Sequence, residues 1–294
     1  LSNHLDGDTK MDIPIIASPM ETVSEVDMAV AMALAGGTAI IHRYNTIEEQ
    51  ESMVNGAFRT VLELNKEAGR AATPLIGASV GVTGGCLERA SRLIDCGASI
   101  ICVDIAHGHH ILAERAIKAL KQRLGGACHL MAGNVATMEG FEDLVKWGAD
   151  SVRVGIGGGS ICSTRTQTGH GVPSFSSVVE CAKSERSDIA IIADGGIKNS
   201  GDIVKALAAG ADFVMLGSLL AGTDESPGEI ISTTDGLSKS YRGMASRAAQ
   251  EEWRGKSASP EGVATMIPYK GSVNDVLRDL RGGISSGLSY SGAS

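Results

Sequence analysis

Aromatic residues make up only 3% of this 294-residue sequence, and proline occurs 7 times. The six cysteines form no C-x-x-C pair and no zinc-like spacing with histidine, which disfavours a zinc site and a redox motif. No signal peptide and no apolar run near the length of a membrane span are recognisable, so we expect a cytoplasmic protein without a membrane contact. The net charge of −8 disfavours nucleic acid as a partner.

Glycine, in contrast, is abundant at 38 residues, and hydrophobic residues make up 43% of the chain. This length and composition suffice for the core of one large α/β domain or of two small ones. The chain opens at Leu1 rather than Met, which leaves room for a missing N-terminal segment.

Eight short aliphatic runs recur along the chain, and apolar residues at helical spacing separate them. Such runs are typical of buried parallel strands. Eight strand-then-helix units predict a closed (β/α)8 barrel, the TIM barrel. The expected strands are residues 13–17, 38–41, 75–80, 100–105, 129–132, 151–156, 189–193 and 213–216.

The doubly wound open sheet is the main alternative fold. It would bind ligands at one switch point, whereas polar or glycine-rich residues follow nearly every expected strand. A weak internal repeat also favours the barrel: Gly97, Gly148 and Gly210 each precede alanine and a strand, where they would end a helix.

The pattern loosens after the eighth expected strand. Residues 222–264 are rich in Gly, Ser, Glu and Pro, and we expect a mobile flap there, with a catalytic part at residues 245–262. Apolar spacing returns over residues 273–284, which predicts a helix that packs on the barrel. We therefore expect one catalytic barrel domain over residues 1–294.

Three glycine-rich turns, at residues 157–160, 194–196 and 217–218, follow the sixth, seventh and eighth expected strands. Neighbouring strands would bring their backbone N–H groups to one phosphate, which barrels often bind at this position. The alternative is that these glycines only form tight turns. Asp194 would lie at a strand end, where a carboxylate can accept hydrogen bonds from sugar hydroxyls.

Cys162 lies beside the first of these turns. A thiol next to a held phosphate suggests a nucleophile whose electrophile is fixed in place, and Thr164 is close enough in sequence to relay a proton. The alternatives are a buried structural cysteine and a simple turn threonine.

The motifs together resemble the family of IMP dehydrogenases and GMP reductases, which are purine-nucleotide oxidoreductases. The resemblance covers essentially the whole chain. It is carried by IASPM at 16–20, DIAHGH at 104–109, AGNV at 132–135, GIGGGSICSTR at 155–165, TGHG at 168–171, ADGG at 193–196, MLGSLLAG at 215–222 and YRGM at 241–244.

The resemblance implies that Cys162 attacks C2 of a purine 5′-monophosphate, GMP or IMP, and forms a covalent intermediate. It places the ribose at Asp194 and the nicotinamide cofactor at Asp104 and Asn134. The implied phosphate ligands are Gly157, Gly159, Ser160, Gly196, Gly217, Ser218 and Tyr241. The rest of the implied nucleotide pocket consists of Ser18, Met20, Gly243 and Met244.

The two activities of this family differ in how the intermediate is resolved. A dehydrogenase hydrolyses it with an Arg-Tyr pair on the flap, and residues 245–262 contain Arg247 and Arg254 but no such pair. A reductase expels ammonia from GMP instead, which requires a proton source, and Thr164 with Glu261 fits that role. We therefore expect an NADPH-dependent GMP reductase.

The connection between Arg43 and Leu75 is also too short for the paired regulatory insertion that most dehydrogenases of the family carry. An IMP dehydrogenase that uses NAD and lacks this insertion stays the alternative, because residues 239–244 resemble the corresponding segment of dehydrogenases. From other classes, a nucleotide-binding regulator without turnover and a phosphate-binding lyase or isomerase are kept open.

The resemblance further implies a homotetramer. It also implies a monovalent cation, K⁺ or another, held by the backbone carbonyls of Gly157, Gly159 and Cys162. The sequence does not distinguish NADPH from NADH.

Overall fold

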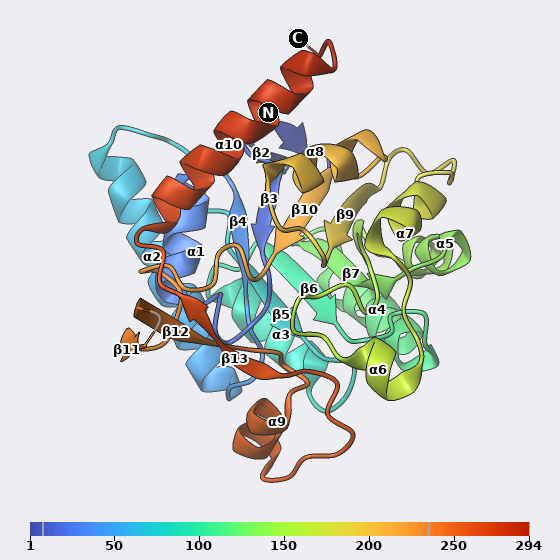
Figure 1. Ribbon diagram of the computed structural model, residues 1–294. Coiled ribbons are helices and arrows are strands. Elements are labelled where there is room, and N and C mark those ends of the chain that lie inside the picture. Colours follow the sequence, from blue (N-terminus) through green and yellow to red (C-terminus); the bar gives the residue numbers. More distant parts are fainter. Residues whose placement is uncertain (8, 235, 294) are drawn as a thin grey trace.

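The computed structural model describes residues 1–7, 9–234 and 236–293. Eight parallel strands form a closed barrel in the order β10-β3-β4-β5-β6-β7-β8-β9 (Figure 1), which confirms the predicted (β/α)8 barrel. Each of the eight expected aliphatic runs contributes one strand. They are β3 (Ile15–Ala17), β4 (Thr38–Ile41), β5 (Gly77–Val80), β6 (Ile100–Asp104), β7 (His129–Val135), β8 (Ser151–Val154), β9 (Ala190–Asp194) and β10 (Phe213–Leu216).

Helices surround this barrel, and local signals fix where several of them begin. Thr46 and Glu49 form a capping box at the start of α2, and the side chains of Thr137 and Asn199 cap α5 and α8. The helices that follow the first seven strands are α1 (Val26–Leu34), α2 (Ile47–Glu67), α3 (Cys86–Asp95), α4 (Ile111–Leu124), α5 (Met138–Trp147), α7 (Ser174–Cys181), with the short α6 (Thr164–Thr168) before it, and α8 (Ser200–Ala208).

The internal repeat has a steric origin. Gly97, Gly148 and Gly210 all have positive φ, at 107°, 118° and 106°. A Cβ atom on Gly97 would lie 2.5 Å from Cγ of Phe58, and one on Gly210 would lie 2.5 Å from Cβ of Ala182. Glycine is therefore needed at these turns both for the left-handed backbone and for the close approach of a neighbouring helix.

A hairpin of β1 (Asn3–His4) and β2 (Lys10–Met11) closes the N-terminal end of the barrel. Leu5 and Met11, each 1% exposed, pack into the barrel interior with Ile16, Ile40 and Phe213. The sequence pattern did not reveal this hairpin because its strands are only two residues long.

Residues 222–264 are more regular than their composition suggests. They contain β11 (Ile231–Thr233), β12 (Gly236–Arg242) and α9 (Arg247–Arg254). Together with β13 (Ala264–Pro268), the two strands form an antiparallel sheet at the end of the barrel opposite to the hairpin (Figure 1). These strands lack aliphatic runs because much of the sheet is exposed to solvent, with Leu237 52% and Met266 42% exposed.

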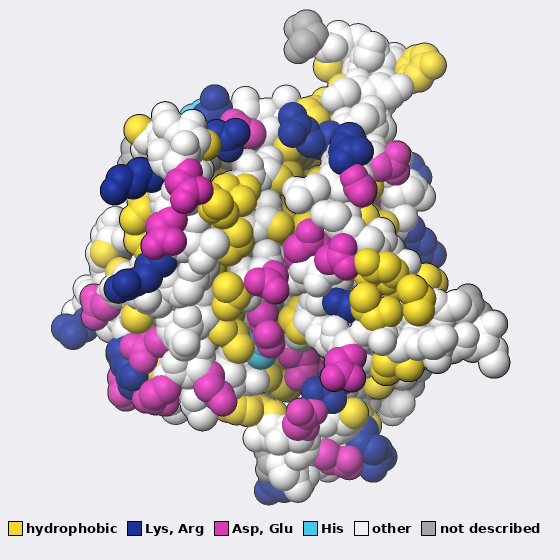
Figure 2. Space-filling model, turned by 90° about the vertical axis from the view of Figure 1, so that its left-hand side faces the viewer, with side chains coloured by type: hydrophobic (Ala, Val, Ile, Leu, Met, Phe, Trp, Pro, Cys, Tyr) yellow, Lys and Arg dark blue, Asp and Glu magenta, His cyan; other side chains and the backbone are white. Residues whose placement is uncertain are grey.

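The predicted C-terminal helix is present as α10 (Val273–Tyr290), which packs against α8 and α1 as the eighth barrel helix. Figure 2 shows one face of the molecule, on which Asp and Glu side chains gather in a central band, in keeping with the net charge of −8. In the described part of the chain, none of the helices combines the length and the apolar character needed to cross a membrane.

We predict that Leu5→Ala lowers the free energy of unfolding by about 2–5 kcal/mol, because it leaves a cavity in the closed end of the barrel. The midpoint of urea unfolding measures this loss. Leu62→Ala is the matched control, since Leu62 on α2 is 45% exposed and the midpoint should not move. Equal effects of the two substitutions would show that the hairpin does not stabilise this end of the barrel.

Candidate active site

A cavity of about 440 Å³ opens at the carboxyl ends of the barrel strands. It brings together most residues that the sequence singled out, although they come from seven separate segments of the chain. The predicted site residues that line it are Ser18, Met20, Asp104, Asn134, Gly157, Gly159, Cys162, Thr164, Asp194, Tyr241, Gly243, Met244 and Glu261.

Cys162, Thr164 and Glu261 form a continuous chain of contacts at this cavity. The Cys162 thiol donates to Thr164 Oγ1 at 3.2 Å, and the Thr164 hydroxyl donates to Glu261 Oε2 at 2.7 Å. A hydroxyl accepts one hydrogen bond while it donates another. Thr164 is therefore placed to pass a proton between the neighbourhood of the thiol and the carboxylate.

Backbone pairing holds these three residues together. Ser163 N–H donates to the Glu261 carbonyl at 2.8 Å, Val263 N–H donates to the Ile161 carbonyl at 3.0 Å, and Cys162 and Gly262 form an antiparallel bridge. The loop after β8 is thus paired with the segment that follows α9. Glu261 reaches Thr164 because the two backbones are joined on either side of it.

The glycine-rich turns lie side by side because β8, β9 and β10 are neighbours in the barrel. Gly155, with φ of 143°, packs so closely that a Cβ atom there would lie 2.0 Å from the Asp194 carbonyl oxygen. A Cβ atom on Gly196 would lie 3.3 Å from the Gly158 carbonyl oxygen. Glycine at these positions lets the turns after β8 and β9 approach each other directly.

Four predicted phosphate residues, Ser160, Gly196, Gly217 and Ser218, are not among the residues that line the cavity in the described chain. Gly217 nevertheless adjoins it, because a Cβ atom there would lie 3.0 Å from the Tyr241 hydroxyl and 3.2 Å from Ser18 Oγ. Burial raises the pKa of Tyr241, and a hydrogen bond with Ser160 opposes this rise. The phenol therefore stays protonated and can donate.

Arg153 is a central residue that we did not identify from the sequence. Its guanidinium, on a side chain only 7% exposed, contacts Asp104 Oδ1 at 2.6 Å and Asp194 Oδ2 at 2.8 Å. Although burial alone lowers the pKa of Arg153, the two carboxylates raise it overall. The available signal was a charged residue inside the otherwise apolar run of β8.

The sheet register explains how Arg153 on β8 contacts Asp104 on β6 past the intervening strand β7. Gly133 on β7 is paired with Asp104 on one side and with Arg153 on the other. A Cβ atom on Gly133 would lie 2.6 Å from Cβ of Arg153, so glycine at this position makes room for the arginine side chain. Asn134 Nδ2 then donates to Asp194 Oδ2 at 2.8 Å, which places both predicted ligand carboxylates in one polar network.

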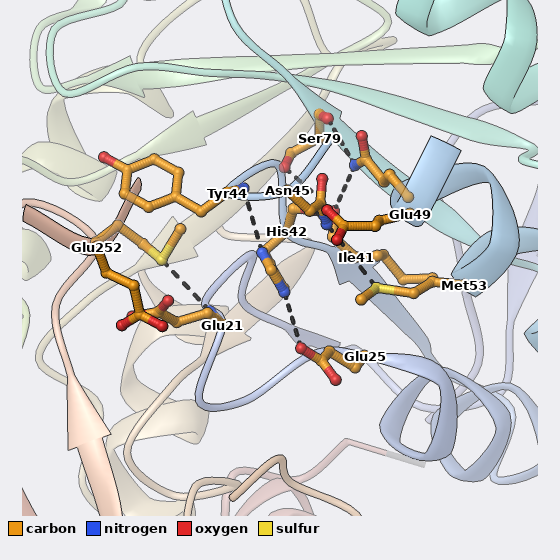
Figure 3. A network of polar contacts seen from close by, with 12 residues as sticks. Glu21, Glu25, Ile41, His42, Tyr44, Asn45, Glu49, Met53, Ser79 and Glu252 are labelled. Atoms are coloured by element: carbon orange, nitrogen blue, oxygen red, sulfur yellow. Dashed lines mark hydrogen bonds and ion pairs between the residues drawn. The ribbon is translucent and has the colours of Figure 1, made fainter. Parts of the chain in front are cut away.

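The rim of the cavity beside β4 is fixed by a buried histidine (Figure 3). His42 Nε2 lies 3.1 Å from Glu25 Oε1, and its Nδ1 accepts from the Tyr44 backbone N–H at 3.2 Å. The intervening Arg43 donates to the Asp104 carbonyl at 3.1 Å. Tyr44 in turn stacks on Trp253 of α9, with ring centroids 6.0 Å apart. The flap segment is therefore docked on the rim.

No group of three or more His, Cys, Asp or Glu side chains among the described residues is placed to hold a metal ion. His109 pairs with Asp143 at 2.9 Å.

We predict that Arg153→Met destabilises the protein by about 3–5 kcal/mol, because it leaves two partly buried carboxylates without their shared cation. Chemical denaturation measures this loss. Arg186→Met is the control: Arg186 pairs with Asp188 on the surface, and its replacement should leave the unfolding midpoint unchanged. If Arg153→Met is equally neutral, the network does not stabilise this end of the barrel.

Comparison with known proteins gives a consistent result. The IMP dehydrogenase / GMP reductase domain model matches residues 1–294. An inosine-5′-monophosphate dehydrogenase from Nitrosopumilus maritimus is 35% identical over 418 aligned residues, which cover 100% of this chain and 88% of the relative. A GMP reductase from Leishmania major is 46% identical over 231 residues, which cover 74% of this chain and 47% of the relative.

A solved structure shares the fold over almost the whole chain. It is a cysteine-to-alanine variant of GMP reductase from Trypanosoma brucei in complex with guanosine 5′-monophosphate, with a TM-score of 0.90 and 32% identity over 99% of this chain and 87% of that chain. Relatives of both names therefore match the same barrel and its loops. The chain belongs to the IMP dehydrogenase / GMP reductase family of oxidoreductases.

Proposed function

We propose that this protein is a GMP reductase, which converts GMP and NADPH to IMP, ammonia and NADP⁺. The observation that carries the proposal is the contact chain from Cys162 through Thr164 to Glu261. Such a chain supplies an acid beside the nucleophile, and residues 245–262 lack the Arg-Tyr pair with which a dehydrogenase would activate water.

Nucleotide binding follows from the polarity of the cavity wall. The glycine turns offer backbone N–H groups to the 5′-phosphate, together with Ser160, Ser218 and the Tyr241 phenol. Ser18 Oγ is buried and has no hydrogen-bond partner among the described residues, so a ligand group there would satisfy it. Asp194 accepts hydrogen bonds from the ribose, and Met20, Gly243 and Met244 lie along the base.

In the proposed reaction, two groups are replaced in turn at C2 of the purine: the amine by the Cys162 sulfur, and the sulfur by a hydride. The Cys162 sulfur adds to C2, the exocyclic amine leaves as ammonia, a hydride is added, and the bond between sulfur and C2 breaks to give IMP. As the thiol attacks, its proton passes through the Thr164 hydroxyl to Glu261, and Glu261 returns a proton through the same hydroxyl to the departing amine. Thr164 at 2.7 Å from the carboxylate is within reach for this transfer.

Members of this family use a nicotinamide cofactor, which would supply the hydride in a reductase. Asp104 and Asn134 fit such a group because their carboxylate and amide line the same cavity as Cys162. Arg153 and Arg43 fix the Asp104 carboxylate, which keeps lone pairs for sugar hydroxyls. We further propose NADPH as the cofactor, a homotetrameric assembly, and a monovalent cation at the carbonyls of Gly157, Gly159 and Cys162.

IMP dehydrogenase is the second candidate function. It is favoured by the whole-length match to a relative of that name at 35% identity and by the dehydrogenase-like residues 239–244. In that case hydride leaves C2 for NAD⁺, and a group other than the Arg-Tyr pair activates the water that releases the product.

The absorbance of reduced nicotinamide separates the two functions in parallel mixtures. We predict that absorbance falls with GMP and NADPH, with ammonia released in equal amount, and stays constant with IMP and NAD⁺. A rise in the second mixture alone would identify a dehydrogenase. Silence in both mixtures, with GMP binding retained, would favour a nucleotide-binding regulator.

We predict that Glu261→Gln lowers the rate of ammonia release by about 10²–10⁴-fold, the usual contribution of general acid–base catalysis, while GMP affinity changes little. Stopped-flow kinetics and calorimetry measure the two quantities. Glu251→Gln on the same segment is the control, because Glu251 is exposed and forms an ion pair with Arg247 of the same helix. Cys162→Ala should abolish turnover but keep binding. Near-native rates of Glu261→Gln would reduce Glu261 to a structural role.

A further inference from the structure

Lys270 lies two residues after the end of β13, and its ammonium group donates hydrogen bonds to three backbone carbonyls. Lys270 Nζ donates to the carbonyls of Ser218 at 2.6 Å, Leu219 at 3.1 Å and Ala221 at 2.7 Å. All three belong to the turn after β10. Burial lowers the pKa of Lys270 to about 8, which reflects the withdrawal of the ammonium from water.

The turn that Lys270 contacts is a single helical turn. The Gly217 carbonyl accepts from Leu220 N–H at 3.0 Å and from Ala221 N–H at 2.9 Å. In such a turn the carbonyls point toward its C-terminal end, and the first N–H groups point toward its N-terminal end. Lys270 occupies the carbonyl end, so the N–H groups of Ser218 and Leu219 point away from it.

The N-terminal end of this turn lies at the candidate active site. Gly217, its first residue, has the Tyr241 hydroxyl, Met20 Sδ and Ser18 Oγ within 3.0 to 3.2 Å of the position a Cβ atom would take. An anion at that end would meet backbone N–H groups, while the ammonium behind the turn binds the opposite ends of the peptide dipoles.

We propose that Lys270 is a positioning residue for nucleotide binding: by holding three carbonyls of the turn after β10, it aims the Ser218 and Leu219 N–H groups at the 5′-phosphate. This inference rests on the proposed function, because it requires a purine 5′-monophosphate in the cavity. Lys270 itself contacts neither the base nor Cys162 in this arrangement, and it acts through the backbone alone.

The chain contains a matched control. Lys239 on β12, 4% exposed, donates to the carbonyls of Thr223 at 2.9 Å, Asp224 at 3.3 Å and Ser226 at 2.7 Å. Its chemistry is the same, but it holds the following loop rather than the turn that begins at Gly217. A purely structural role should therefore give the two lysines similar effects, whereas a positioning role should not.

Calorimetric titration with GMP and with guanosine tests the proposal, because the two ligands differ only in the phosphate. We predict that Lys270→Met weakens GMP binding by about tenfold or more, in line with the loss of charge-assisted hydrogen bonds, and leaves guanosine binding unchanged. Lys270→Arg should recover part of the difference. Lys239→Met should lower the melting temperature but keep the native ratio of the two affinities.

An unchanged ratio of GMP to guanosine affinity in Lys270→Met would overturn the inference, as would an equal change in Lys239→Met. If Lys270→Met does not fold, Lys270→Gln, which donates hydrogen bonds without a charge, takes its place and the same ratio decides. Failure of the native protein to bind GMP or IMP would instead reject the proposed function, so the two failures are distinguishable.

Discussion

The carboxyl end of this barrel depends on one buried cation. Arg153 joins Asp104 of β6 to Asp194 of β9, at 2.6 Å and 2.8 Å, across the space that Gly133 leaves open. Without it, two partly buried carboxylates would lose the cation that they share. Arg153 holds both carboxylates in place, so that they are aimed into one cavity. That condition is necessary for either of them to bind sugar hydroxyls.

A second constraint joins two parts of the candidate site that lie far apart in the sequence. Cys162 follows β8, whereas Glu261 follows α9, 97 positions beyond Thr164. The barrel alone does not bring them together. Backbone pairing between residues 161–163 and 261–263 does, and the stack of Trp253 on Tyr44 fixes the other side of the same segment to the rim. A displacement of the segment would therefore remove Glu261 from Thr164 without disturbing the glycine turns.

The sequence allowed the barrel and most of the cavity wall to be predicted because buried parallel strands are continuous apolar runs, and because their ends carry Gly, Asp and Cys in a recognisable order. The same reasoning missed Arg153, since an isolated charge in an apolar strand gives no indication of its partners. It also missed the sheet of β11 to β13, because its strands are largely exposed to solvent and therefore lack aliphatic runs. Lys270 could not be identified because its three acceptors are backbone carbonyls, which carry no residue-specific signal.

Under the proposed function, the two activities of the family would differ in the segment after β12 rather than in the barrel. The proposed nucleophile, the glycine turns and the carboxylates would serve both reactions, since each is proposed to begin with attack of the Cys162 sulfur on C2. The outcome depends on the group that the segment presents to the intermediate: a water activator leads to hydrolysis, and an acid leads to loss of ammonia. In this chain the segment brings Glu261 to 2.7 Å from Thr164 and contains no Arg-Tyr pair. This contact supports the proposed protonation of a leaving amine, and the missing Arg-Tyr pair disfavours activation of water by that route.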